Sequence, residues 1–316
     1  MVRYANIDDA KKAVLPWNGQ PASVTHLGDR GNSIFSFLNS ENKLQIIRFT
    51  DPDFRTLPEL KAELNFITYL YNSGVPVARP LKSKNHQFYF NFPCQSGDLI
   101  CSSIAFADGN EIQEDSPLWN NTYFYEWGKN LGLIHKAASQ YQIQPSEPKR
   151  WIWSDEILIK NSHLLIPQSD QKTKDELQEI IDICMSLEIN NLNYGLIHAD
   201  HAPQNFRYDQ STQIITAFDF GNCCYHWFIS DLAISLSTVR RKKNREQIRE
   251  NILAGYSQVF VLPPNYSELI ELFIRLRVVY VYLSRLHLWS VDTTVEQKQN
   301  IELLRNMVHT KSGWKI

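Results

Sequence analysis

The segment LIHADHAPQNFRYDQSTQIITAFDFGN, residues 196–222, constrains the fold of this chain more than any other stretch. Two short apolar runs, residues 194–199 and 213–220, have the composition of buried strands. Acidic and amide residues stand at the ends of these runs, and the turn-forming sequence RYDQSTQ lies between them. A strand, a tight loop and a hairpin can bring side chains from both strand ends to one point. The segment therefore predicts a polar site built on two strands.

The residue types in this segment suit phosphoryl transfer, in which a protein mainly positions groups and neutralises charge. They form the pattern His198-x-Asp200-x4-Asn205, followed after about a dozen residues by Asp219-Phe220-Gly221. An acceptor hydroxyl needs a carboxylate that orients it and takes its proton, and Asp200 is the candidate. Magnesium prefers oxygen ligands, which Asn205 and Asp219 offer as an amide oxygen and a carboxylate.

Upstream, the sequence predicts a small antiparallel sheet with one helix. Residues 22–27 and 43–49 have the composition of strands, and residues 28–37 between them predict a turn followed by another strand. Apolar residues recur at helical spacing over residues 57–74, which end in Asn-Ser-Gly. A further strand is expected at residues 86–92.

Pro93 and Gly97 predict a break, at which we place the boundary between two domains, residues 1–94 and 95–316. After the break the pattern is mostly helical, with amphipathic segments at residues 123–138, 174–188 and 246–309. The predicted fold class is therefore α+β, with a small sheet-containing lobe and a larger helical lobe.

Composition restricts the classes of partner. The chain has 316 residues, of which 43% are hydrophobic and 21% charged, with a net charge of −2. Such a composition is typical of a folded protein without a field that attracts nucleic acid or an anionic membrane. The exception is RRKKNREQIR, residues 240–249, which can be a solvated helical face or a place that meets an anion.

The sequence favours a cytoplasmic protein in a reducing compartment. Its N-terminus lacks the apolar run of a signal peptide, and three arginines interrupt the most apolar late segment, residues 272–289. The five cysteines form no CxxC pair, which argues against a disulfide framework and a zinc site. The oligomeric state is left open.

The HxDxxxxN and DFG motifs, downstream of a small antiparallel lobe, resemble the protein-kinase-like fold and, within it, the aminoglycoside phosphotransferase and choline kinase group. The catalytic segment IHAD lacks the arginine that precedes the aspartate in protein kinases, and no APE-like segment follows Asp219. Instead, DFGNCCYHWFISDLA, residues 219–233, is similar to a segment of bacterial stress-response kinases and type II homoserine kinases.

This resemblance implies a two-lobed enzyme that uses ATP, or GTP as the alternative, with Mg²⁺ to phosphorylate a hydroxyl of a small molecule such as a metabolite or an aminoglycoside. Asp200 is then the catalytic base, Asn205 and Asp219 bind the metal, and His198 and Asp231 support the loops. The nucleotide is expected to meet three features of the first lobe: the loop residues Gly28, Gly31, Asn32 and Ser33, the pair Arg48 and Glu63, and a hinge with Phe92 and Cys94.

Three positions depart from the pattern of this group. Arg48 stands where a lysine is usual, Gly221 and Asn222 replace two aspartates, and His201 replaces an apolar residue. We expect His201 either to contact the substrate or to pack in the interior. Each single motif also has an ordinary explanation: Gly28 and Gly31 can mark a plain hairpin, and Glu63 can be an exposed helix acid.

Two other functions fit the same motifs. A protein Ser/Thr kinase of the stress-response type differs in having an open acceptor groove. A catalytically weak pseudokinase differs in binding nucleotide without metal-dependent turnover, and the substitutions at Arg48 and Gly221 favour it.

Overall fold

A computed structural model describes residues 2–29, 31–289 and 293–311 of the chain. These residues form two compact units. Unit 1 comprises Met1–Glu111, Tyr141–Arg150 and Phe206–Gly221, and unit 2 comprises Ile112–Gln140, Trp151–Asn205 and Asn222–Ile316. The chain thus passes between the units several times, whereas the sequence predicted a single boundary after Cys94.

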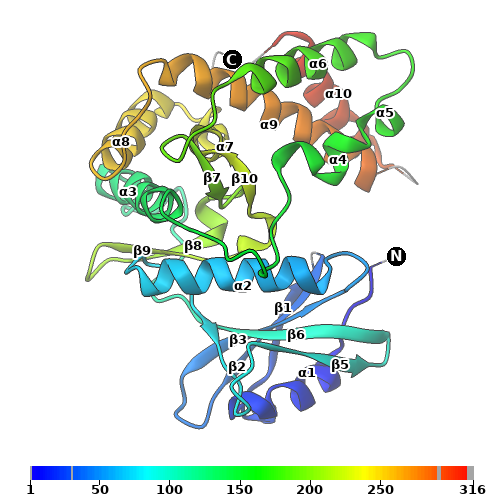
Figure 1. Cartoon of the computed structure of the whole chain (residues 1–316), viewed down its shortest axis with the longest axis vertical. Coiled ribbons are helices and arrows are strands. Elements are labelled where there is room, and N and C mark those ends of the chain that lie inside the picture. Colours follow the sequence, from blue (N-terminus) through cyan, green and yellow to red (C-terminus); the bar gives the residue numbers. More distant parts are fainter. Residues whose placement is uncertain (1, 30, 290–292, 312–316) are drawn as a thin grey trace. The chain divides into compact units, whose positions relative to one another are not determined.

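Unit 1 is built on a six-stranded antiparallel sheet in which the order is β1-β2-β3-β6-β4 and β5 pairs with β6 (Figure 1). Its strands are β1 (Thr25–Asp29), β2 (Asn32–Leu38), β3 (Leu44–Thr50), β4 (Pro80–Leu81), β5 (Tyr89–Cys94) and β6 (Gly97–Ala105). The predicted strands at residues 28–37, 43–49 and 86–92 are confirmed, and the first predicted strand begins three residues late. The sequence analysis missed β6, and β6 carries the sheet beyond the predicted domain boundary.

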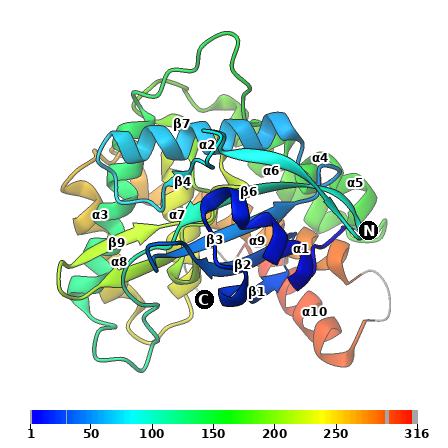
Figure 2. The same ribbon diagram turned by 90° about the horizontal axis from the view of Figure 1, so that it is seen from below.

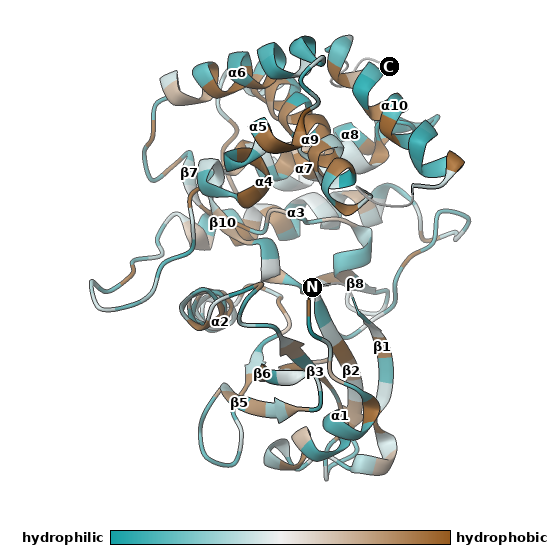
Figure 3. Ribbon diagram, turned by 90° about the vertical axis from the view of Figure 1, so that its right-hand side faces the viewer, coloured by the Kyte–Doolittle hydropathy of each residue, from teal (hydrophilic) through white to brown (hydrophobic). Residues whose placement is uncertain are grey.

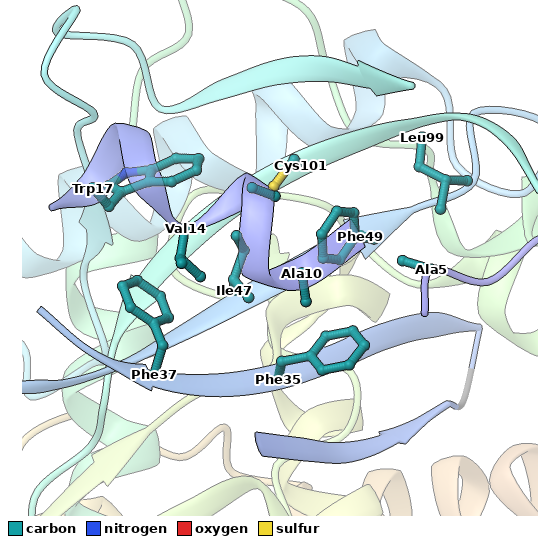
Figure 4. Close-up of a cluster of buried hydrophobic side chains, with 11 residues drawn as sticks. Ala5, Ala10, Val14, Trp17, Phe35, Phe37, Ile47, Phe49, Leu99 and Cys101 are labelled. Atoms are coloured by element: carbon teal, nitrogen blue, oxygen red, sulfur yellow. The ribbon is translucent and has the colours of Figure 1, made fainter. Parts of the chain in front are cut away.

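One face of this sheet packs against the N-terminal helix α1 (Ile7–Ala13) and the short helix that follows it (Figure 2). Strand alternation places Phe35 and Phe37 of β2 and Ile47 and Phe49 of β3 on this face, where they surround Val14 (Figure 4). Burial of these aromatic and branched side chains stabilises the sheet and fixes its register.

The opposite face packs against helix α2 (Leu57–Asn72), as Figure 1 shows. Leu60 and Leu64 of α2 contact Ile100 of β6. The helix begins with a capping box between Thr56 and Glu59, and it ends at the predicted stop. The two faces of the sheet therefore differ: one carries the apolar cluster of Figure 4, and the other faces α2.

Unit 1 also contains the hairpin of β8 (Phe206–Asp209) and β9 (Ile214–Ala217) from the middle of the chain. The side chain of Asp209 closes the turn by accepting hydrogen bonds from the backbone N–H of Ser211 and the hydroxyl of Thr212. The backbone N–H of Ala78 donates to the carbonyl of Ala217 at 2.8 Å, which ties β9 to the segment before β4.

Unit 2 is mainly helical and holds the predicted amphipathic segments. Figure 3 shows hydrophobic residues concentrated on α7 and α9, whereas α6 and α10 carry more hydrophilic surface. Its helices are α3 (Asn121–Ala138), α4 (Ile157–Lys160), α5 (Ser162–Leu165), α6 (Gln171–Ser186), α7 (Phe228–Val239), α8 (Arg245–Ser257), α9 (Tyr266–Leu288) and α10 (Val295–His309). None of the described helices combines the length and hydropathy that crossing a bilayer requires.

A two-stranded antiparallel ladder of β7 (Tyr194–Ile197) and β10 (Cys224–Trp227) lies within this helical unit. The strand β7 is the first apolar run of the opening segment, and β10 was missed by the sequence analysis. Because β7 is short and paired, the residues that follow it leave the ladder at a fixed point.

Candidate active site

The loop after β7 carries the predicted base. His198 is fully buried, and its ring Nδ1 accepts a hydrogen bond from the backbone N–H of Asp200 at 3.3 Å. Ala199 between them has φ +64°, a left-handed conformation that is uncommon for a residue with a side chain. The loop is therefore held in a strained shape, and something must compensate for that strain.

Asp231 on α7 supplies that compensation. Its carboxylate accepts hydrogen bonds from the backbone N–H groups of His198 at 2.7 Å and Ala199 at 3.1 Å. The Nε2 of His135 also lies 3.3 Å from this carboxylate. Burial by itself raises the pKa of Asp231, but the hydrogen bond from His135 and the nearby histidines lower it overall. The supporting role inferred for Asp231 and His198 matches these contacts.

Asp200 and Asn205 lie in direct contact within unit 2. The side-chain nitrogen of Asn205 donates both to the backbone carbonyl of Asp200 at 2.8 Å and to its carboxylate Oδ2 at 3.0 Å. Because two acceptors face the nitrogen, the orientation of the amide is determined. The amide oxygen of Asn205 is left as a free acceptor among the described residues.

Arg277 on α9 contacts the same carboxylate. Its Nη2 lies 2.7 Å from Oδ1 of Asp200, so both oxygens of Asp200 have a partner in this structure. The sequence analysis interpreted Arg277 only as a charge that interrupts an apolar helix. No local motif marks it, because it is 77 residues away from Asp200 along the chain.

The suggestion that His201 contacts a substrate is wrong. Its side chain is 0% exposed, and both ring nitrogens are engaged: Trp127 donates to Nδ1 at 3.1 Å, and Nε2 lies 2.9 Å from Oδ1 of Asn130. Burial lowers the pKa of His201 well below its ordinary value, so the ring is neutral. His201 anchors the loop to α3, which the alternative of interior packing anticipated.

In unit 1, the two glycines flank the turn between β1 and β2. Gly28 pairs with Ile34 in the register, and Gly31 has φ +73°. A Cβ at Gly31 would also lie 2.9 Å from the ring of Phe54. The turn is thus a glycine-dependent hairpin, and its residue 30 lies outside the described part of the chain.

Asn32 and Ser33, the predicted phosphate donors, face opposite sides of the sheet. Ser33 is fully buried on the α1 face, and its hydroxyl accepts a hydrogen bond from the backbone N–H of Ala5 at 3.0 Å. The side chain of Asn32 faces the same side as Arg48 and accepts from the hydroxyl of Thr50 at 2.8 Å. A phosphate-binding hydroxyl at Ser33 is therefore ruled out by strand alternation.

Arg48 and Glu63 form the expected pair between β3 and α2. The Nη1 of Arg48 lies 2.7 Å from Oε1 of Glu63, and both side chains are 4% exposed. The bland alternatives of an edge charge and an exposed helix acid are therefore wrong. A buried ion pair of this kind fixes the position of α2 against the sheet.

The DFG segment belongs to unit 1. Asp219 is exposed and has φ +62°, and Phe220 packs edge-on against Phe66 of α2 with ring centroids 6.0 Å apart. Arg150 donates to the backbone carbonyls of Gly221 at 2.6 Å and of Glu59 at 3.0 Å. These contacts connect the segment to α2, and the sequence analysis missed Arg150.

The predicted hinge at Phe92 and Cys94 is also wrong. Both residues lie in β5 and pack against the apolar cluster on the α1 face. The chain turns back at Gln95 and Ser96 into β6, and it leaves unit 1 only after Glu111. The connecting segment therefore follows Ala105, the last residue of β6.

Comparison with known proteins decides the family of this chain. The model of the phosphotransferase enzyme family matches residues 28–272. The chain belongs to the phosphotransferase enzyme family. The matched region includes the glycine turn, the Arg48–Glu63 pair, the loop of Asp200 and the DFG segment.

Individual phosphotransferases are similar over most of the chain. The amicoumacin kinase of Bacillus subtilis (strain 168) is 26% identical over 288 residues, which cover 88% of this chain and 84% of that protein. A structure of amicoumacin kinase hAmiN in complex with AMP-PNP, Ca²⁺ and Ami has a TM-score of 0.90 and 27% identity, covering 99% of this chain and 95% of that one. A microcompartment-associated aminopropanol kinase has a TM-score of 0.80 and 18% identity, covering 96% and 95%.

The predicted fold class, an α+β fold of the protein-kinase-like type, is confirmed. The resemblance to the aminoglycoside phosphotransferase group is likewise confirmed. This phosphotransferase is an enzyme that transfers a phosphoryl group to a hydroxyl of a small molecule.

Proposed function

We propose that this phosphotransferase uses Mg²⁺ and ATP, with Asp200 as the base that orients the acceptor hydroxyl and accepts its proton. Asn205 and Asp219 are the metal ligands in this proposal, and the buried Arg48 is the residue that contacts the phosphates. The observation that carries it is the double donation from the Asn205 amide to Asp200, which leaves the amide oxygen free for a cation.

The residues fit a divalent cation and a nucleotide. Asn205 offers a neutral oxygen whose direction is fixed, and Asp219 offers an exposed carboxylate. Bound Mg²⁺ would neutralise charge on the nucleotide phosphates. Arg48 is held by Glu63, so its guanidinium can present further N–H donors to a phosphate without searching for an orientation.

Similar proteins support these ligands and the type of acceptor. Amicoumacin kinase hAmiN was solved with AMP-PNP and Ca²⁺, a nucleotide and a divalent cation. Its name and that of aminopropanol kinase denote kinases of small hydroxyl compounds. We therefore favour a small-molecule acceptor over a protein acceptor for this chain.

Asp200 acts by position as well as by basicity. The backbone N–H of Asp200 is held by His198, and Asn205 holds its Oδ2. A carboxylate held in this way can align the acceptor hydroxyl with the phosphoryl group, an effect that can lower a barrier by about 7 to 11 kcal/mol when the geometry is good.

The test is an ATP-consumption screen with amino alcohols, sugars, homoserine and aminoglycosides as acceptors, with and without Mg²⁺. GTP replaces ATP in a parallel series. We expect Mg²⁺-dependent transfer to at least one acceptor and loss of that transfer in Asp219→Ala. Nucleotide binding in a thermal-shift assay that needs no metal, without turnover on any acceptor, would instead support a pseudokinase.

A further inference from the structure

Three arginines lie around one corner of unit 2, and a single carboxylate is hydrogen-bonded to them. Arg240 and Arg241 follow α7 directly, and Arg277 lies on α9, which packs against α7. Among the described residues, the only acid in a hydrogen bond or ion pair with any of the three is Asp200. The corner therefore carries more positive than negative charge.

Arg277 has hydrogen-bond donors to spare. A guanidinium carries five N–H donors, and in the described part of the chain only Nη2 of Arg277 has a hydrogen-bonding partner, Asp200 at 2.7 Å. The aromatic ring of Tyr280 lies 5.5 Å from the guanidinium carbon and restricts its plane. The remaining donors have the fork arrangement that binds a carboxylate or phosphate through two hydrogen bonds.

Arg240 is half-buried without an acid. Its guanidinium donates to the backbone carbonyl of Ser237 at 3.2 Å and lies 3.7 Å from the sulfur of Met307, and its Nε is buried with no hydrogen-bond partner within the described residues. The sulfur of Met307 also accepts from Arg241 at 3.0 Å. A thioether sulfur is a weak acceptor and does not neutralise two guanidinium groups.

The charges in this corner repel one another. Burial lowers the pKa of Arg240 to about 10, and the nearby Arg241 and Arg277 contribute to the decrease. A partly buried cation that lacks a counter-charge is unfavourable, and such groups are found where a ligand supplies that charge. An oxyanion would relieve the repulsion and satisfy the unused donors.

We propose that Arg277, assisted by Arg240 and Arg241, forms a subsite for an oxyanion carried by the acceptor. This inference rests on the proposed function, because it takes Asp200 as the group that receives the acceptor hydroxyl. Since Arg277 touches Asp200, the oxyanion lies only a few bonds from that hydroxyl. The acceptor is then a hydroxy acid or a hydroxyl compound with a phosphate group, and not an amine of the same length.

The basic segment at residues 240–249 thereby acquires a specific role at its first two positions. Its later charges have protein partners: Lys242 pairs with Glu114, and Arg249 lies 3.9 Å from Glu246. The anion expected as one alternative for this segment is therefore assigned to Arg240 and Arg241 alone.

The experiment compares acceptors that share one hydroxyl and differ only in charge. Initial rates of ATP consumption are measured with 4-hydroxybutanoate, 4-hydroxybutanamide and 4-aminobutan-1-ol, and with glycerol 3-phosphate against glycerol. The proteins are the unmodified chain, Arg277→Gln, Arg240→Gln and the control Arg275→Gln. Arg275 removes the same charge from α9, but it pairs with Glu176 and Glu179 of α6, and Glu176 keeps Lys311 as a partner.

We expect kcat/KM for the anionic member of at least one series to exceed that of its neutral counterpart by about tenfold or more, the effect of one charged hydrogen-bonded pair. Arg277→Gln should bring this ratio close to one, Arg240→Gln should lower it, and Arg275→Gln should leave it unchanged. The carboxylate and phosphate series show which oxyanion is preferred.

Equal kcat/KM values for anionic and neutral acceptors in the unmodified chain would overturn the subsite while leaving the proposed kinase activity standing. Absence of phosphoryl transfer to any acceptor would count against the proposed function instead. The subsite is then tested by calorimetric binding of 4-hydroxybutanoate. Weakening of about tenfold in Arg277→Gln supports it, and equal binding by both proteins, as for an adventitious ion only, contradicts it.

Discussion

At the scale of single residues, a buried carboxylate determines the shape of the catalytic loop. Asp231 receives two backbone N–H groups and a histidine without any exposure to solvent. His135 on its other side completes its hydrogen bonds through Tyr256, whose hydroxyl lies 2.9 Å from Nδ1. Because every partner is buried, the network has no water to replace a lost contact.

Asp231→Asn should therefore lower the free energy of unfolding by about 1 to 3 kcal/mol, because an amide cannot accept all the N–H groups that now face the carboxylate. Urea denaturation measures this change. Asp209→Asn is the matched control, because an asparagine can also close the β8–β9 turn, and its effect should be within about 0.5 kcal/mol. Equal losses in both variants would contradict the role of Asp231.

A second carboxylate predicts how stability depends on pH. The side-chain hydrogen bond from Arg3 lowers the pKa of Asp51 to about 2, against the opposing effect of burial. Because the pKa of Asp51 is depressed by folding, its contribution to stability is complete above the ordinary pKa of about 3.9 and is lost as the pH falls toward 2.

Arg3→Gln should accordingly destabilise the protein at pH 7, and the difference from the unmodified chain should shrink as the pH falls below about 4. Denaturant titrations between pH 3 and pH 7 measure it. Asp53→Asn serves as the control, because Asp53 is the other acid that Arg3 contacts and is 85% exposed. A difference that stays constant across this range would show that the charge of Asp51 is not responsible.

At the scale of elements, the turn between β1 and β2 combines a backbone requirement with a site. Gly31→Ala should lower the free energy of unfolding by about 1 kcal/mol, because φ +73° is unfavourable for alanine, and it should raise KM for the nucleotide. Gly74→Ala, at φ +79° with no atom within 4 Å of the added Cβ, isolates the backbone cost. It should lose similar stability at an unchanged KM, and an equal rise in KM for both variants would contradict the role of the turn.

The sequence predicted elements where a long apolar pattern exists. The spacing of Leu60 and Leu64 located α2, and similar patterns located α3, α6 and α9. It missed α1, although Asn6 and Asp9 form a capping box that marks its start. It also missed β6, because Pro93 was interpreted as the end of a lobe, whereas in the structure it lies inside an edge strand.

The candidate site was predictable in its motifs and not in its distant contacts. Asp200 and Asn205 are five residues apart, so their spacing in the sequence reports their proximity in space. Arg277 approaches Asp200 only because α9 packs against the rest of unit 2, and tertiary packing leaves no local pattern. The errors at Ser33 and His201 have a related cause, because which face a side chain occupies depends on the element that covers it.

At the scale of the whole molecule, the two units share the functional residues between them. Unit 1 contains Arg48, Glu63 and Asp219, and unit 2 contains Asp200 and Asn205. The chain divides between Asn205 and Phe206, in the middle of the segment that first indicated phosphoryl transfer. Activity in this account therefore depends on residues from both units, and the base remains the residue whose loss has the most specific consequence.

The measurement that tests the central claim most directly is steady-state turnover and ATP affinity of Asp200→Asn, with an acceptor identified in the screen. We predict that turnover falls at least about 100-fold while ATP affinity stays within about twofold, because Asp200 acts on the acceptor hydroxyl and not on the nucleotide. A variant that turns over at a near-normal rate would contradict the assignment of Asp200 as the catalytic base.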